Sequence, residues 1–155
     1  MKDVLLSIYT DMILSLHTGS VNGNIAVSKP LYIITIIEAI ESGGLEYNRI
    51  NLANEFIRNR FGQLYEHTYG NRKGYESSFF VRPYFHLDSA PFYHLIWKQD
   101  VTYTNKSITP SAKYLRENLL YAKLDDDLWE LLQDAGSREY IKQSIIRRYL
   151  TKQQD

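Results

Sequence analysis

Cysteine is absent from this chain of 155 residues. The sequence therefore provides no disulfide framework, no thiolate nucleophile and no cysteine-ligated zinc or iron–sulfur site. Long hydrophobic runs are missing too, because the longest uncharged apolar stretch, residues 30–37, is far shorter than the ~20 residues that span a bilayer. Asp11 and His17 interrupt the first 18 residues, which argues against a signal peptide. We expect a cytoplasmic protein that does not enter the membrane.

The common catalytic and nucleotide-binding signatures are also missing. The chain contains no G-x-S-x-G, no G-x-x-x-x-G-K, no G-x-G-x-x-G and no H-E-x-x-H. No serine is placed beside a histidine by spacing alone, so a hydrolase with a histidine-based site is only a third alternative. We therefore expect a protein that is not an enzyme and that needs no cofactor.

The composition is that of one ordinary globular domain covering residues 1–155, with 44% hydrophobic and 23% charged residues. The net charge is zero but unevenly distributed. Residues 49–116 hold ten Lys/Arg against five Asp/Glu, a net of +5, whereas residues 1–48 carry −3 and residues 117–155 carry −2. This pattern fits either a mixed solvated surface or a basic face for a polyanion.

Hydrophobic periodicity predicts helices in both halves of the chain. Asn51 is the expected cap of the third helix, and Asp127 with Glu130 has the spacing of a capping box. Gly43 and Gly44 are expected to end the apolar second helix. The expected helices cover residues 3–18, 31–42, 52–68 and 109–121, a short segment from Asp127, and residues 137–150.

A doubled motif lies between the two helical groups. Pro83-Tyr84-Phe85-His86-Leu87 is repeated as Pro91-Phe92-Tyr93-His94-Leu95. Proline followed by aromatic residues is typical of strand starts, so we expect both copies to be strands of a small antiparallel sheet within residues 79–104. The predicted fold class is therefore α+β, a mostly helical single domain with this sheet between two helical segments.

Two strands that each end in His-Leu would bring His86 and His94 together, with Asp88 as a third polar group. Two histidines are only half of a metal site, and no cysteine pair or H-x-x-x-H completes it, so we expect no metal. The run Asp125-Asp126-Asp127 lies at an expected helix start, where acidic groups favour the helix dipole, and we interpret it as structural.

Aromatic and basic residues are mixed over residues 65–106, a composition that suits either a binding surface or a tyrosine-rich core with a solvated rim. Tyr84, Tyr93 and Tyr149 are candidates for the walls of an apolar pocket. The candidate DNA-binding residues are Arg72, Lys73, Arg82, His86, His94, Lys98 and Lys106.

Three blocks, in this order and spacing, resemble a known family. They are Ser28-Lys29-Pro30 before a Leu/Ile helix, the doubled aromatic-His-Leu motif, and LDDDLWELLQD followed by SREYIKQSIIRRYL. Over residues 25–150 the chain resembles the N-terminal, sulfur-binding-type DNA-binding domain of HNH-type, McrA-like restriction endonucleases. Members of that family that recognise sulfur use a Tyr-Pro pair near the end of the domain, whereas Tyr149 is followed here by Leu150. No HNH segment follows Leu150.

The resemblance implies a non-catalytic module that binds double-stranded DNA, with phosphorothioate-modified DNA as one reading and a nuclease as its partner chain. A sulfur atom is softer and less hydrated than a phosphate oxygen, so apolar walls beside basic groups would favour it. The alternative is a protein–protein interaction or scaffold domain that keeps the fold without binding DNA. The sequence leaves the oligomeric state open.

Overall fold

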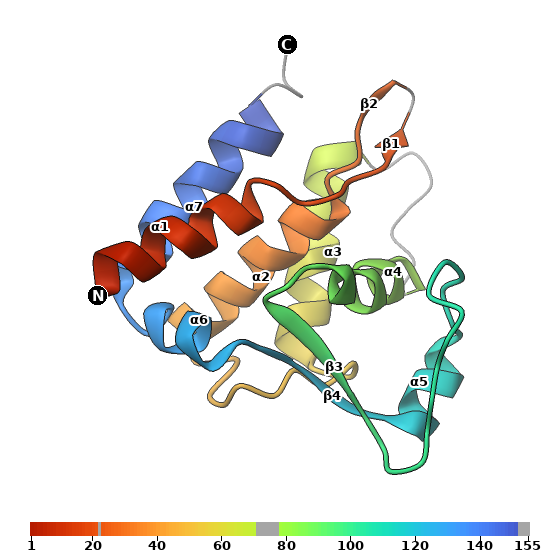
Figure 1. Cartoon of the computed structure of the whole chain (residues 1–155). Helices are drawn as coiled ribbons and strands as arrows, with labels where there is room; N and C mark the ends of the chain where they lie inside the picture. The colour runs from red at the N-terminus through yellow and green to blue at the C-terminus, as the bar shows by residue number, and fades with distance from the viewer. Residues whose placement is uncertain (22, 71–77, 152–155) are drawn as a thin grey trace.

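Helix α2 (Ser28–Ser42) runs through the centre of the protein (Figure 1). Every residue from Pro30 to Ile37 is buried, because leucine, isoleucine and tyrosine occupy all sides of this helix. Gly43 ends it with a positive φ of 84°, a conformation that glycine adopts without strain. The prediction of a buried central helix is confirmed.

The computed structural model describes residues 1–21, 23–70 and 78–151. Helix α2 packs against α3, α4 and α7, while α1 packs against α6 and α7. The predicted α+β class, mostly helical with a small antiparallel sheet, is confirmed (Figure 1). The helices are α1 (Lys2–Ile13), α3 (Glu55–Tyr69), α4 (Ser78–His86), α5 (Ala112–Asn118), α6 (Asp126–Leu131) and α7 (Ala135–Ile145), with a 3₁₀ turn at Leu87–Ser89 and a π-helical turn at Ile146–Leu150.

The main sheet has two antiparallel strands, β3 (Tyr93–Trp97) and β4 (Leu119–Leu124). Tyr93 lies opposite Leu124 and the register shifts between Ile96 and Trp97. On the other side of β4, Ile50 forms an isolated bridge with Ala122. A second, two-stranded ribbon consists of β1 (Ser20–Val21) and β2 (Asn24–Ile25).

The prediction that both copies of the doubled motif are strands is wrong for the first copy, which lies in α4 and the 3₁₀ turn. Phe80, Val81, Tyr84 and Phe85 are buried at the spacing of a helix rather than of a strand, and Pro83 and Leu87 are buried as well. Only the second copy, with Tyr93 and Leu95 buried, alternates as a strand does.

The sheet is consequently not contained in residues 79–104. The partner of β3 is Leu119–Leu124, whose first residues were expected to belong to a helix reaching residue 121. Pairing with β3 explains the difference, since Ala122 and Leu124 are buried at alternate positions and Leu119 is buried beyond the register shift, while Leu120 is half exposed. The structure thus joins two segments that are separated by the long loop of residues 98–111 and by α5.

Two expected caps are also corrected. Asn54 rather than Asn51 caps α3, and its side chain accepts a hydrogen bond from the Ile57 amide at 2.9 Å. The residue that precedes α6 is Asp125, so Asp127 is exposed inside the helix and caps nothing. Helix α1 ends at Ile13, five residues before the expected end.

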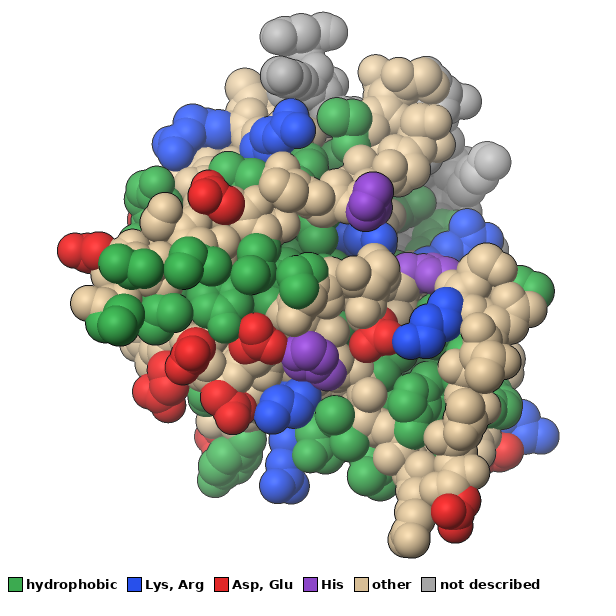
Figure 2. Space-filling view, viewed as in Figure 1, with side chains coloured by type: hydrophobic (Ala, Val, Ile, Leu, Met, Phe, Trp, Pro, Cys, Tyr) green, Lys and Arg blue, Asp and Glu red, His purple; other side chains and the backbone are tan. Residues whose placement is uncertain are grey.

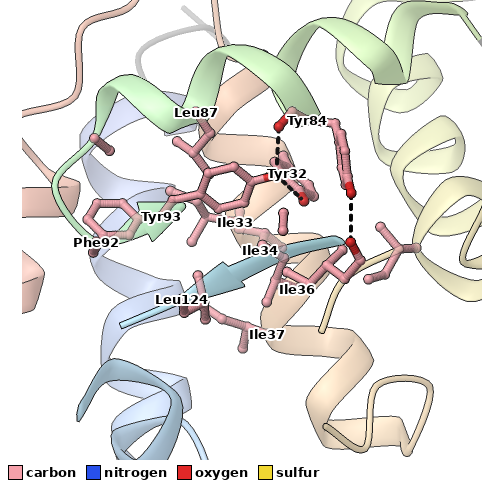
Figure 3. Close-up of a cluster of buried hydrophobic side chains, with 14 of the residues drawn as sticks. Tyr32, Ile33, Ile34, Ile36, Ile37, Tyr84, Leu87, Phe92, Tyr93 and Leu124 are labelled. Atoms are coloured by element: carbon pink, nitrogen blue, oxygen red, sulfur yellow. Dashed lines mark hydrogen bonds between the residues drawn. The ribbon is translucent and has the colours of Figure 1, made fainter. Parts of the chain in front are cut away.

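Three buried tyrosines tie the two copies of the doubled motif to α2 (Figure 3). The Tyr93 hydroxyl donates to the Tyr84 carbonyl at 2.6 Å and lies 2.9 Å from the Tyr32 hydroxyl, which is then the donor of that second bond. The Tyr84 hydroxyl donates to the Ile50 carbonyl at 2.7 Å. The Tyr32 and Tyr93 rings meet edge to face with centroids 5.7 Å apart. Every buried hydroxyl of this tyrosine cluster is therefore bonded.

Candidate functional site

A surface pocket of about 370 Å³ lies between the start of α2, the end of α4 and the β1–β2 ribbon. Its basic side chains are Lys29, Arg82 and His86, and Pro83 and Ala26 supply apolar wall. We call it the basic pocket. None of the described residues that line it is Asp or Glu. Three basic groups therefore converge on one hollow without an acidic group among them.

Lys29 is held in place within the basic pocket. Its ammonium donates to the His17 carbonyl at 2.9 Å and to the Ser89 hydroxyl at 3.3 Å. Burial lowers the pKa of Lys29 from its ordinary value, because removing water disfavours the charged form. Its hydrogen-bond acceptors are a carbonyl and a hydroxyl, which orient the ammonium without neutralising it.

His86 lies in the last turn of α4, where its Nε2 is 2.7 Å from the Thr109 hydroxyl of the long loop. Burial first, and then the charges of Lys29 and Arg82, lower the pKa of His86 below its ordinary 6.5. The imidazole is therefore mainly neutral at pH 7. An anion in the basic pocket would offset the repulsion from Lys29 and Arg82 and favour the protonated form.

The position of the basic pocket at the start of α2 makes the electrostatic potential in the pocket more positive. Ser28 and Lys29 line the pocket and form the first turn of this fifteen-residue helix. The N-terminal end of a helix carries the positive end of the macrodipole and favours anions. Arg82 is exposed, and its guanidinium has no hydrogen bond or ion pair with any other described residue. It is therefore available to a ligand.

The structure brings together only part of the predicted DNA-binding set. Arg82 and His86 share the basic pocket, whereas His94, Lys98 and Lys106 do not line it. Lys98 is exposed just after β3, and the Lys106 ammonium lies 3.4 Å from the Asp88 carboxylate. Two further candidates, Arg72 and Lys73, fall outside the described residues.

The predicted apolar pocket is corrected, because its three tyrosines belong to the core. Tyr84 and Tyr93 are fully buried and Tyr149 is 3% exposed. The Tyr149 hydroxyl donates to the Ile13 carbonyl at 2.7 Å, far along the sequence from the other two. Each hydroxyl has a hydrogen-bond partner in the core, and none of the three side chains lines the basic pocket.

His94 lies in a separate hollow, lined by Tyr9, Lys123 and the three aspartates Asp125 to Asp127. His94 Nε2 is 2.6 Å from one Asp125 oxygen, and the Tyr9 hydroxyl donates to the other at 2.9 Å. Burial and then Asp125 raise the pKa of Tyr9 to about 12. We call the hollow that these residues line the acidic hollow. None of its lining residues is Ser, Thr or Cys, the usual partners of a histidine in nucleophilic catalysis.

The expected pair of histidines on neighbouring strands is not formed, because His86 is on a helix and His94 on a strand, and the two line different pockets. One Asp88 oxygen instead accepts a hydrogen bond from the Leu95 amide at 3.0 Å. Within residues 1–21, 23–70 and 78–151, no cluster of three His, Cys, Asp or Glu could hold a metal ion.

Lys29, Ser28 and Ser89 belong to the basic pocket but were absent from the predicted site. The sequence predicts that a helix starts at Ser28-Lys29-Pro30. A lysine in the first turn opposes the helix dipole, and this is the sequence signal that could have pointed to Lys29 as a site residue. Such a residue has a role other than stabilising its helix. Ser89 carried no comparable signal.

Figure 2 shows the two environments on one face of the protein. Acidic side chains gather below the apolar band that covers α1, with a His and basic side chains beside them, and further Lys, Arg and His side chains lie above this band and to its right. No described helix is long and apolar enough to cross a membrane. No family model matches the chain, and no curated protein is significantly similar to it in sequence.

Proposed function

We propose that this protein is a non-catalytic DNA-binding module that holds the DNA backbone at the basic pocket. The observation that carries the proposal is the convergence of Lys29, Arg82 and His86 on one hollow that has no acidic residue among its described walls. Arginine and lysine contacts to phosphate supply much of the affinity of proteins for DNA. The N-terminal end of α2 favours the same charge.

The walls of the basic pocket influence which kind of DNA backbone it accepts. Ala26 and Pro83 present apolar surface beside the three basic groups. That mixture suits a phosphodiester and also a phosphorothioate, whose sulfur is less hydrated than oxygen. A role as the targeting part of a restriction-type system, with a nuclease as partner chain, is supported by the family resemblance of the sequence alone.

Fluorescence anisotropy on a labelled duplex tests the proposal. The duplex is prepared with plain linkages and with one phosphorothioate, and each form is measured at two salt concentrations. The Arg82→Gln substitution should weaken binding to every sequence and lower the salt slope by about 1, because one phosphate contact is lost. Arg147→Gln, an exposed arginine outside the pocket, is the matched control and should change neither quantity. Equal effects of the two substitutions would refute the pocket as the DNA site.

One observation favours a different function, an interaction with another protein. On α1, Val4 is 54% and Ile8 is 44% exposed, although both are apolar. Exposed apolar surface of this kind is common at protein interfaces. If wild-type protein binds neither duplex, and Val4→Asp/Ile8→Asp abolishes a self-association seen by light scattering, the interaction function replaces the DNA-binding one.

A further inference from the structure

A second pocket, of about 150 Å³, lies where the start of α3, the first half of α4 and α5 meet. Its floor and walls are apolar and consist of Leu52, Ala53, Phe80, Val81 and Ala112. Two arginines, Arg58 and Arg116, complete its lining. We call it the arginine pocket. It shares no lining residue with the basic pocket, so it is a separate site.

Neither arginine is neutralised by the described part of the chain. Arg58 is half-buried on α3 and Arg116 is exposed in the last turn of α5, and no described carboxylate lies within ion-pair distance of either one. The contrast with Arg60, only two residues after Arg58, is informative. Arg60 is bonded to Glu38 at 2.7 Å, so an arginine of the same helix has its acidic partner while the pocket arginine has none.

The arginines determine what charge the pocket accepts. A guanidinium presents parallel N–H groups that match the two oxygens of a carboxylate. Two such groups beside one small hollow favour an anion, and its charge is worth more there because Arg58 is partly removed from water. The site therefore favours an ionised acceptor over a neutral one.

The size and walls of the pocket determine the rest of the ligand. Pockets for drug-sized ligands measure ~300–1,000 Å³, so a hollow of about 150 Å³ accepts only a group of a few carbon atoms. Leu52, Ala53 and Ala112, together with the buried Phe80 and Val81, give that group an apolar surface, and the polar side chains among the described lining residues are the two arginines. We propose that the arginine pocket binds a short apolar group that carries a carboxylate.

That chemistry has two sources, a free short-chain acid or the C-terminal residue of a peptide. Binding to the full chain is followed by amide chemical shifts in NMR with hexanoate, its neutral amide hexanamide, acetyl-alanyl-leucine and the amide of that peptide. Both acids should bind saturably and at least about tenfold more tightly than their amides, because a charged hydrogen bond is lost in each amide. A larger affinity for hexanoate identifies the free acid as the source, and a larger affinity for the peptide identifies a chain end.

Two variants separate the charge of the pocket from its apolar cavity. Arg58→Gln/Arg116→Gln should abolish the preference for acid over amide, and Ala112→Leu, which fills the hollow, should weaken hexanoate while both arginines remain. Lys113→Gln, next to the pocket but outside its lining, should change nothing. Circular dichroism confirms that each variant is folded.

The wild-type measurements alone can refute the proposal, whatever the variants do. No saturable binding of either acid up to about 50 mM, equal binding of acid and amide, or inorganic phosphate that competes as well as hexanoate would each overturn it.

Discussion

His86 and His94 occupy the same position in two copies of one sequence motif, and the structure places them in opposite environments. His86 lies on a helix in the basic pocket, where burial and then the charges of Lys29 and Arg82 disfavour its protonation. His94 lies on a strand in the acidic hollow, 2.6 Å from Asp125. The motif therefore does not define the role of its histidine. The backbone and the neighbours that tertiary packing supplies define it.

The same comparison shows what the two copies share. Leu87 is fully buried in the first copy and Leu95 is 9% exposed in the second, so both copies deliver their last leucine to the core. Each copy also supplies one tyrosine to the tyrosine cluster, Tyr84 from the helix and Tyr93 from the strand. The two copies are thus alike toward the core and unlike toward solvent.

The largest expected effect concerns this shared core role. Leu87→Ala and Leu95→Ala should each lower the free energy of unfolding by about 2–5 kcal/mol, because each removes buried methyl groups and leaves a cavity. Urea denaturation of both variants measures the effect. If one variant loses less than about 1 kcal/mol of unfolding free energy while the other loses several, the two copies are not equivalent in the core.

The next effect tests the hydrogen bonds that join the copies. Tyr93→Phe removes the donor to the Tyr84 carbonyl and the acceptor for the Tyr32 hydroxyl, so it should cost about 1–3 kcal/mol. Thermal and urea unfolding give the change. Tyr140→Phe, on a tyrosine that is 51% exposed, is the matched control and should be nearly neutral. A neutral Tyr93→Phe would show that the buried bonds between the copies are not needed.

A smaller effect tests the contacts of the aspartates in the acidic hollow. Asp125→Ala should cost about 1 kcal/mol, chiefly because it removes the acceptor of the partly buried Tyr9 hydroxyl. The exposed pair with His94 adds little, since such pairs are worth about 1 kcal/mol or less. Asp127→Ala should lie within about 0.5 kcal/mol of wild type, because this exposed residue caps nothing. If Asp127→Ala instead lowers the free energy of unfolding by as much as the loss of a helix cap does, Asp127 does act in the predicted capping box.

The smallest effect distinguishes the two histidines by pH. The pKa of His86 is lowered in the folded protein, so the unfolded chain binds more protons below pH 6.5 and His86 reduces stability as the pH falls there. Under the proposed function, a DNA phosphate in the basic pocket favours the protonated form of His86. The affinity of the protein for DNA should therefore rise several-fold as the pH falls from about 7.5 to 5.5. Anisotropy should show that His86→Asn removes this rise and His94→Asn keeps it. The opposite pattern would place the DNA at the acidic hollow.

Much of the architecture could be predicted where one signal dominates its segment. The Leu/Ile run ending at Gly43 has apolar residues on every side, which suffices for a buried helix. The second copy of the doubled motif, residues 91–95, is predicted to be a strand because proline precedes aromatic residues, and the strand Tyr93–Trp97 overlaps it. In Ser78–His86, by contrast, Pro83 and the aromatic residues favour a strand locally, and packing against α2 decides in favour of the helix.

The candidate site was harder to predict, for a physical reason. Arg82 and His86 are four residues apart and were both named, but Lys29 reaches the same pocket from another helix. Neither periodicity nor composition relates residue 29 to residue 86. The tyrosine surplus was ambiguous in the same way, since a tyrosine with a buried hydrogen-bond partner and one on a binding surface look identical in sequence.

The central claim is that His86 shares its pocket with a bound DNA phosphate, and the protonation of His86 reports on this most directly. An NMR pH titration of the histidine ring resonances, with and without a plain duplex, follows it in the intact chain. We expect DNA to raise the pKa of His86, because the phosphate offsets the charges of Lys29 and Arg82. The His94 resonances, from the acidic hollow, should not respond to the DNA. A His86 titration that saturating DNA leaves unchanged would contradict the claim.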